Sequence, residues 1–382
     1  MTKRKLDCLC EDDVYGGPPQ IPLNGYVASP LRKRPYTPHS SHGSDHDYSS
    51  SQSSPAINRS TGKPKRSFCS QLCGLFKALC MMTSCVLLMA FAFFLWKTYR
   101  CESDRQLVYD IEGLRKSLKE NLFGQNLART EILEAMTRFV GPDGPAVSVL
   151  ALTGWLGGGK TFTSSLIREH FPLPENLHTF SVPLHFAENT DNFHFLADLT
   201  QHIGRSCGHS LVVFDDVDSA SSAAVERIER FIVSLKHTLP SPRGNGTLVV
   251  LTSNKGGEAI NKYVFDLMRE QAASRDRLTS ETLLRVMEEE GIEVPAVRSS
   301  MRHGIPARIV PYLPLTRDHV KQCVRREISR QGFTVHEQDV NDVLREVRFF
   351  SDDFPVLAAS GCKQISGKVD VLLGGQDPYL AG

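Results

Sequence analysis

The sequence predicts an α/β fold in which a largely parallel sheet is flanked by helices and followed by a small helical domain. Short apolar runs alternate with helical patterns, and this alternation is typical of crossover units with parallel strands. The chain after Pro314-Leu315 carries helical patterns instead, at 316–330 and 336–348. The expected strands lie at 146–153, 179–184, 211–214, 248–252 and 308–312.

The region before this domain differs from it in composition. Ser, Pro, His and charged residues dominate 1–66, which leaves little apolar surface to offset the entropy lost on ordering. We therefore expect a disordered tail over 1–68. The whole chain balances 44 basic against 43 acidic residues, which gives no electrostatic reason to expect nucleic acid as a partner.

An uncharged run over 78–96 predicts one transmembrane helix. Its 19 residues would span roughly 28 Å as a helix, close to the hydrocarbon thickness of a bilayer. Lys77 and Lys97 bracket the run, and Trp96 stands where interfacial aromatic residues belong. A buried core helix rarely runs this long without a polar face, and a cleaved signal peptide would lie closer to Met1.

The charges around this run predict its orientation. Five basic residues precede it without a nearby acid, whereas three follow it among Glu102 and Asp104. The positive-inside rule then places the amino terminus in the cytosol and the remainder of the chain in a lumen. The basic residues are Arg59, Lys63, Lys65, Arg66 and Lys77 before the run, and Lys97, Arg100 and Arg105 after it.

The segment 154–161 satisfies the pattern G-x-x-x-x-G-K-[ST] of nucleotide phosphate loops. It follows the expected strand at 146–153 and precedes a helical pattern, which is the context that such loops require. Glycines allow backbone N–H groups to converge on phosphate oxygens, Lys160 brings positive charge to the β and γ phosphates, and Thr161 can ligate Mg²⁺. With both flanks correct, a chance glycine-rich turn is the weaker interpretation. The loop consists of Gly154, Trp155, Leu156, Gly157, Gly158, Gly159, Lys160 and Thr161.

Polar residues end two further expected strands. Asp215 follows 211–214, where it can hold Mg²⁺ through water, and Asp216 stands where ATPases of this type usually have a Glu that polarises the attacking water. Asn254, after 248–252, could orient that water. Alone, each signal also fits an ordinary turn. The sequence 254–257 lacks the Asp of the guanine-reading signature, which favours ATP over GTP.

Together these residues resemble the torsin family of AAA+ ATPases. The resemblance covers about 121–373, and the anchor favours a membrane-anchored member over members with a cleaved signal peptide. Its landmarks are Asn121-Leu122-Phe123-Gly124-Gln125, Gly154-Trp155, Asn254, Leu313-Pro314-Leu315, Phe349-Phe350 and Ser360-Gly361-Cys362-Lys363.

The resemblance implies an AAA+ fold, ATP and Mg²⁺ as cofactors, assembly as a homo- or hetero-oligomer, and a location in the lumen of the endoplasmic reticulum or nuclear envelope. It also implies that Asn254 is a first sensor and Lys363 a second sensor near the γ phosphate, which with Asp216 make up the expected catalytic residues. The family generally lacks its own arginine finger. A membrane-bound activator is therefore expected to supply an Arg in trans, an effect worth about 10³–10⁵ in rate in other NTPases.

Two residues depart from the family pattern. Many torsins carry Asn where this chain has Thr161, and Thr is the better Mg²⁺ ligand. They carry Glu where this chain has Asp216, which is shorter by one methylene. Because a misplacement of about 1 Å can cost about 10²-fold in rate, we expect slow or conditional hydrolysis.

The cysteines follow the same resemblance. Cys323 and Cys362 match a pair that the family can join as a nucleotide-responsive disulfide, while two buried thiols remain the alternative. Cys207 is expected to pack behind the strand at 211–214. Asn245-Gly246-Thr247 fits a glycosylation acceptor, with its occupancy left open by the nearby strand.

The sequence therefore predicts an ATPase that remodels a protein or membrane partner, with an ATP-binding scaffold of little intrinsic hydrolysis as the alternative. The expected domains are a cytosolic tail at 1–68, an anchor at 78–96, a helical stalk at 97–120, an AAA+ nucleotide-binding domain at 121–315 and a small helical domain at 316–382.

Overall fold

The computed structural model describes residues 68–106, 109–186, 194–239, 246–270, 274–350 and 356–374. The chain divides after Ser70, and Gln71–Gly382 is one unit that holds all the features described below. The expected disordered tail and the glycosylation acceptor Asn245 lie outside the described residues.

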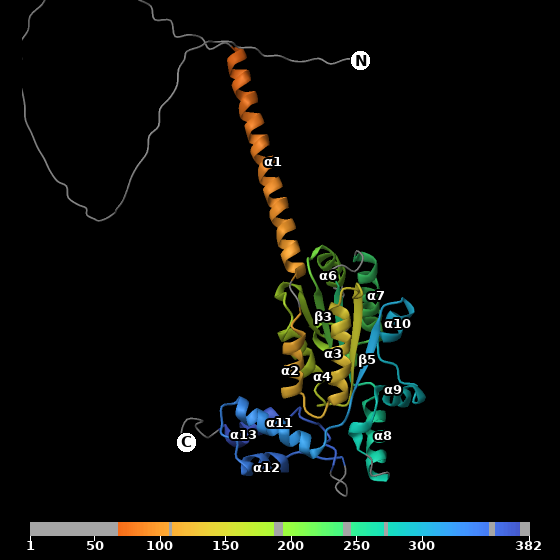
Figure 1. Cartoon of the computed structure of the whole chain (residues 1–382). Coiled ribbons are helices and arrows are strands. Elements are labelled where there is room, and N and C mark those ends of the chain that lie inside the picture. Colours follow the sequence, from red (N-terminus) through yellow and green to blue (C-terminus); the bar gives the residue numbers. More distant parts are fainter. Residues whose placement is uncertain are drawn as a thin grey trace, which may run out of the picture. The chain divides into compact units, whose positions relative to one another are not determined.

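Five parallel strands form a sheet in the order β2-β3-β4-β1-β5 (Figure 1). The expected α/β class is thereby confirmed, and all five expected strands are present. The second strand ends earlier than expected, at Ser181, because a short helix with Pro183 in its first turn follows at once. The strands are β1 Val147–Gly154, β2 Leu177–Ser181, β3 Ser210–Asp215, β4 Thr247–Ser253 and β5 Ala307–Tyr312.

Helices cover both faces of this sheet (Figure 1). Alternate residues of each central strand point to opposite faces, so that Val149 and Ala151 enter one core while Leu150 and Leu152 enter the other. The helices are α1 Phe68–Gln106, α2 Ile111–Asn121, α3 Asn126–Val140, α4 Lys160–Glu169, α5 Val182–His185, α6 His194–Arg205, α7 Ser222–Thr238, α8 Gly257–Glu270, α9 Ser280–Glu289, α10 Val297–Arg302, α11 Arg317–Arg330, α12 Glu337–Arg345 and α13 Ile365–Leu373, with 3₁₀ turns η1 Pro174–Asn176, η2 Val217–Ser219 and η3 Arg275–Arg277.

The C-terminal helices α11, α12 and α13 share a third core of their own. Val320, Val324 and Ile328 line one face of α11 at helical spacing, and Val340 and Val343 of α12 pack against them. The small helical part that the sequence predicts is therefore present. Its second helix ends at Arg345, three residues before the expected end, and the chain then turns into an isolated bridge between Phe349 and Ala358.

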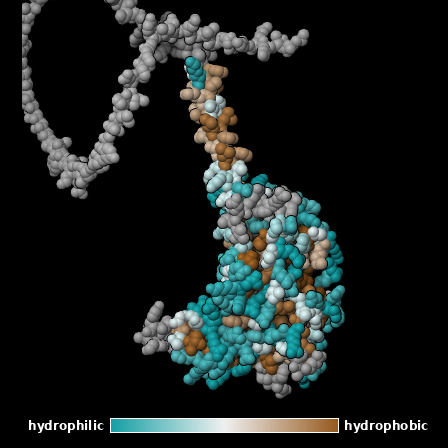
Figure 2. Space-filling view, viewed as in Figure 1, coloured by the Kyte–Doolittle hydropathy of each residue, from teal (hydrophilic) through white to brown (hydrophobic). Residues whose placement is uncertain are grey.

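Helix α1 is the one helix among the described residues that is long and apolar enough to cross a membrane. Within its stretch Gly74–Asp104, the most apolar 18 residues have a mean hydropathy of 2.4, and none of them is buried. Figure 2 shows hydrophobic side chains along this helix. Within the segment 97–120, α1 runs on to Gln106, and α2 buries Leu114 and Leu118 in the domain core.

Candidate functional site

The phosphate loop connects β1 to α4, as the sequence predicts. Gly157 has a φ of 72°, in the left-handed region that favours glycine. A side chain there would also collide with the backbone carbonyl of Ser360, which comes from the segment before α13. The glycine therefore serves two purposes, because it shapes the loop and lets a distant segment lie against it.

The ammonium group of Lys160 is held inside the loop. Its Nζ donates to the carbonyl oxygens of Gly154 at 2.7 Å and Trp155 at 2.8 Å, and the residue is only 8% exposed. Burial lowers the pKa of Lys160 to about 8, although three nearby aspartates, the largest effect coming from Asp218, oppose the shift. The ammonium group is therefore bonded to the backbone of its own loop, and burial makes its charged form less favourable.

Thr161 and Asp215 lie together, as expected for a shared Mg²⁺ site. The Thr161 hydroxyl donates to Oδ1 of Asp215 at 2.9 Å, and Thr252 of β4 donates to the same oxygen at 2.6 Å. Hydroxyl and carboxylate oxygens are the ligands that Mg²⁺ prefers, so this pair fits the ion. The sequence interpretation missed Thr252, which fixes the carboxylate from the neighbouring strand.

Asp216 and Asn254 also meet, from the ends of adjacent strands. The Asn254 amide donates to Oδ1 of Asp216 at 3.4 Å, and the Asp216 N–H donates to the Thr252 hydroxyl at 2.8 Å. Asp216 has a φ of 61°, unusual for a residue other than glycine. The backbone at Asp216 is therefore held in a special conformation at the place where a water-activating acid is expected.

Asp218 is a site residue that the sequence interpretation missed. It accepts a hydrogen bond from the Ser253 hydroxyl at 2.7 Å and another from the N–H of Asn254. These bonds hold the end of β4, and with it the Asn254 side chain, in place. The signal in the sequence was the third acid of Asp215-Asp216-Val217-Asp218, which is easily overlooked beside the first two.

The segment before α13 packs directly on the phosphate loop. The N–H of Cys362 donates to the Gly157 carbonyl at 3.1 Å, and the Trp155 indole donates to the Ala359 carbonyl at 2.6 Å. Cys362 is joined to Cys323 of α11 in a disulfide, with Cα atoms 6.2 Å apart. The two cysteines singled out by the resemblance are thus bonded beside the loop.

These residues surround one pocket with a volume of ≈ 590 Å³. The phosphate loop forms one wall, the ends of β3 and β4 a second, and the C-terminal helices a third. The size suits a nucleotide. The glycine-rich loop and the Lys160 ammonium fit its phosphates, and the oxygens of Thr161 and Asp215 fit the Mg²⁺ that accompanies them. The lining residues include Leu156, Gly157, Gly158, Gly159, Lys160, Thr161, Asp215, Asp216, Asn254, Cys323, Arg326, Cys362 and Lys363.

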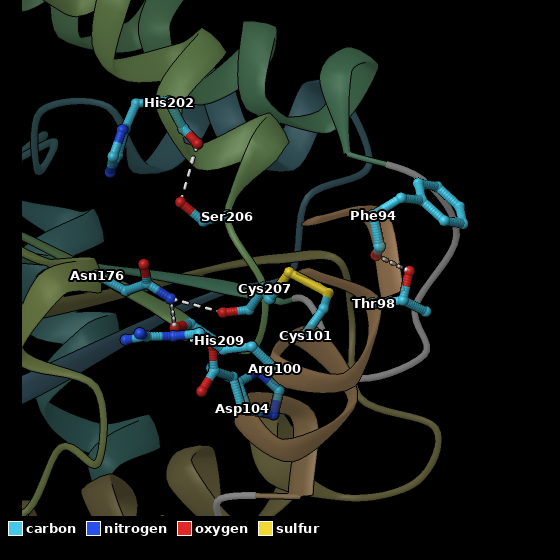
Figure 3. The surroundings of a disulfide bond; sticks show 10 residues. All are labelled: Phe94, Thr98, Arg100, Cys101, Asp104, Asn176, His202, Ser206, Cys207 and His209. Carbon is cyan, nitrogen blue, oxygen red and sulfur yellow. Dashed lines mark hydrogen bonds and ion pairs between the residues drawn. A yellow bond between two sulfur atoms is a disulfide. The ribbon is translucent and has the colours of Figure 1, made fainter. Parts of the chain in front are cut away.

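Cys207 does not pack behind β3, contrary to the sequence expectation. It forms a disulfide with Cys101 of α1, with Cα atoms 5.0 Å apart (Figure 3). The expectation was wrong because Cys207 lies in the connection between α6 and β3 and not under the strand, where α1 can reach it.

Two family models match the chain. The torsin model matches residues 96–214, and the model of the torsin-1A C-terminal domain matches residues 315–371. Both matches support the torsin family. The first includes the phosphate loop and β3 as far as Phe214, and the second includes Cys323, Cys362 and Lys363. Asp215, Asp216 and Asn254 lie outside both matches.

Solved structures that match part of the chain include those of Hsp104. A closed-state Hsp104 structure with ATPγS and casein is 15% identical, covers 69% of this chain and 47% of that chain, and has a TM-score of 0.47. The S. cerevisiae Hsp104–casein complex in its extended conformation is 16% identical, covers 70% of this chain and 47% of that chain, and has a TM-score of 0.48. This chain therefore spans about half the length of those chains. The torsin matches support an AAA+ ATPase-type function, which implies nucleotide and Mg²⁺ as cofactors.

Proposed function

We propose that this chain is a membrane-anchored AAA+ ATPase, resembling torsin-4A, that couples its nucleotide state to the remodelling of a protein or membrane partner. One observation carries the proposal: the residues selected from the sequence as Mg²⁺, water and sensor residues line one pocket together with 156–161 of the phosphate loop, whereas Gly154 and Trp155 lie outside its lining. They come from the phosphate loop, from two strand ends and from the C-terminal helices. A structural role alone does not require this convergence.

Each residue has a distinct task in this proposal. ATP would supply the phosphoryl group, and Mg²⁺ would supply positive charge that offsets the negative charge of the phosphates. Lys160 binds the β and γ phosphates, while Thr161 and Asp215 hold the ion. Asp216 accepts a proton from the attacking water, and Asn254 orients that water through the contact that it already makes with Asp216.

Lys363 is the proposed second sensor. It lines the pocket from the C-terminal part of the chain, next to Cys362, whose N–H bonds to the phosphate loop. A γ phosphate between Lys160 and Lys363 would draw the C-terminal helices toward the loop. Because the Cys323–Cys362 disulfide lies in this contact, we propose that its redox state alters nucleotide binding.

The proposed activation requires an Arg from a partner. Arg326 is the one arginine among the described residues that line the pocket. Its Nε donates to the Asn121 side chain at 2.9 Å. Arg326 is thereby directed to the end of α2 in its own chain. A membrane-bound activator, or a neighbouring subunit of an oligomer, would supply the missing charge in trans.

The proposed location is the lumen of the endoplasmic reticulum or nuclear envelope, with the amino terminus in the cytosol. Two disulfides favour an oxidising compartment for the folded domain. The charge bias around α1 favours the same orientation.

The test uses the full chain in lipid nanodiscs. We expect saturable, Mg²⁺-dependent binding of ATP and slow turnover, with Lys160→Ala weakening binding at least tenfold. Lys119→Ala, which removes an exposed lysine outside the pocket, is the matched control and should bind as the parent does. Unchanged binding by the Lys160 variant would contradict the proposal.

A scaffold that holds ATP without turning it over is the second candidate, and Asp216 is the observation that favours it. Its carboxylate is one methylene shorter than Glu, and its φ of 61° fixes the backbone from which it extends. Asp216→Glu separates the two candidates. A large gain in turnover at unchanged ATP affinity would identify the natural chain as a scaffold, whereas little change would favour the activator-dependent ATPase.

A further inference from the structure

Two covalent links join α1 to the folded domain. One is the main chain, which continues from Gln106 toward α2. The other is the Cys101–Cys207 disulfide, which joins residues 106 positions apart and attaches α1 to the connection between α6 and β3 (Figure 3). A helix joined through the main chain alone could tilt against its domain, and the second link restricts that motion.

The local packing around Cys207 is close. Gly208 has a φ of 78°, and a side chain on it would meet the Asp104 carbonyl of α1 at 3.0 Å. Asn176, only 4% exposed, donates to the carbonyls of Cys207 and His209 at 2.8 and 3.1 Å. The backbone that receives α1 is therefore itself held in place by a buried side chain.

The disulfide lies close to the apolar part of α1. Cys101 is five residues beyond Trp96, a rise of about 7.5 Å along a helix. The polar layer of a bilayer extends about 5–7 Å beyond the hydrocarbon on each side. If the hydrocarbon ends near Trp96, Cys101 lies at the outer boundary of the headgroup layer, and Cys207, whose Cα atom is 5.0 Å from that of Cys101, lies within reach of the headgroups.

We propose that the surface around this disulfide is a membrane-docking surface, which lies in the phospholipid headgroup layer and is held there by the Cys101–Cys207 bond. The inference rests on the proposed membrane anchoring of α1. The surface includes η1 and the C-terminal end of α6, where Glu175 and Arg205 are exposed. Glu175 lies 3.9 Å from Arg100 of α1, and such charged groups suit hydrated headgroups and not hydrocarbon.

The docking surface and the nucleotide pocket lie at opposite ends of the same strand. β3 begins three residues after Cys207 and ends at Asp215, about 17 Å further along at 3.3 Å per residue. When the starting end of β3 docks on the membrane, its other end, with Asp215 and Asp216, faces away from the docked surface. Partners can then reach the nucleotide pocket without contacting the membrane at this place.

Photo-crosslinking in nanodiscs tests the proposal. The full chain carries benzoylphenylalanine at Glu175 or Arg205, with Lys262, an exposed residue of α8 beyond the carboxyl end of β4, as the distant control. We expect phospholipid adducts at the first two positions and at least tenfold fewer at Lys262. Equal yields at all three positions would overturn the docking surface.

Two variants test the role of the bond. The double variant Cys101→Ser/Cys207→Ser should lose most of the lipid adducts at Arg205, whereas Cys323→Ser/Cys362→Ser should keep them. In case the first variant misfolds, a second change inserts seven residues, about two helical turns or 10 Å, between Trp96 and Cys101. This insertion keeps the bond but moves it from the bilayer and should also abolish the adducts; adducts that survive both changes would refute the proposal.

The result also separates this inference from the proposed anchoring. Extraction of the chain from membranes by alkaline carbonate would mean that α1 is not an anchor. Retention in the membrane, combined with free thiols at Cys101 and Cys207 by mass spectrometry, would leave the anchor intact and remove the docking surface.

Discussion

The two ends of the parallel sheet differ in how they hold their functional parts. At the carboxyl ends of β1, β3 and β4, hydrogen bonds among charged and polar groups such as Thr161, Asp215 and Asn254 build a pocket. At the starting end of β3, a disulfide and the buried Asn176 fix the backbone around Cys207. The first arrangement can exchange its bonds with a ligand. The second cannot, which suits it to hold α1 in a fixed position on the domain.

Each end also carries one disulfide, and the two bonds differ in the length of chain that they close. Cys101–Cys207 closes a separation of 106 residues and Cys323–Cys362 one of 39. Because a cross-link restricts the unfolded chain more when the loop is longer, the two bonds give a direct way to compare the two ends.

The largest expected effect is on stability when these bonds are removed. Cys101→Ser/Cys207→Ser should lower the free energy of unfolding by up to about 5 kcal/mol, and Cys323→Ser/Cys362→Ser by up to about 4 kcal/mol. Pulse proteolysis across a urea series measures both on the full chain in nanodiscs. At low urea, where both variants are folded, only Cys323→Ser/Cys362→Ser should alter ATP binding. The reverse pattern, with the pocket disturbed by the loss of Cys101–Cys207, would show that the two ends are not independent.

A smaller effect, on ATP affinity, is expected from substitution of Gly157, which allows the segment before α13 to pack on the phosphate loop. Gly157→Ala combines left-handed strain of about 1–3 kcal/mol with a collision against the Ser360 carbonyl. Gly291 has a φ of 67° and open space within 4 Å of the position that a Cβ atom would take, so Gly291→Ala carries the strain alone. We expect Gly157→Ala to weaken ATP binding at least tenfold and Gly291→Ala to leave it unchanged, as measured by equilibrium titration. Equal affinities would mean that the close approach at Gly157 is not needed.

The sequence predicted the pocket end of the molecule far better than the other end. The phosphate loop follows a local pattern, and the meeting of Asp215, Asp216 and Asn254 follows from parallel strands, whose carboxyl ends lie at one edge. Thr252 escaped notice because its role depends on a hydrogen bond between β4 and the end of β3, and Asp218 because its role depends on hydrogen bonds between η2 and the end of β4.

The disulfides show the same limit. Cys323 and Cys362 were paired by resemblance to a family and not by any property of the residues. The partner of Cys207 could not be found, because it lies 106 residues away on a helix whose placement depends on how the whole domain packs. The burial of Leu114 and Leu118 in α2 depends in the same way on the packing of the domain, because residues of α3 and α4 share their core.

The smallest effect concerns the pH dependence of ATP binding at the pocket end. Burial lowers the pKa of Lys160 to about 8, so above this pH the free protein has largely lost the proton. Phosphate favours the charged ammonium, and binding above pH 8 must therefore take up a proton. ATP affinity should fall by up to about tenfold per pH unit between about pH 8 and 9.5.

Calorimetry in buffers of different ionisation enthalpy measures that proton uptake directly. Lys160→Arg provides the comparison, because a guanidinium stays charged throughout this range and should bind with no uptake, even if its shape weakens the complex. The Cys101→Ser/Cys207→Ser variant should keep the full uptake, since its change lies at the other end of β3. If proton uptake on ATP binding persists in Lys160→Arg, another group takes up the proton, and the pH dependence of ATP binding does not come from Lys160.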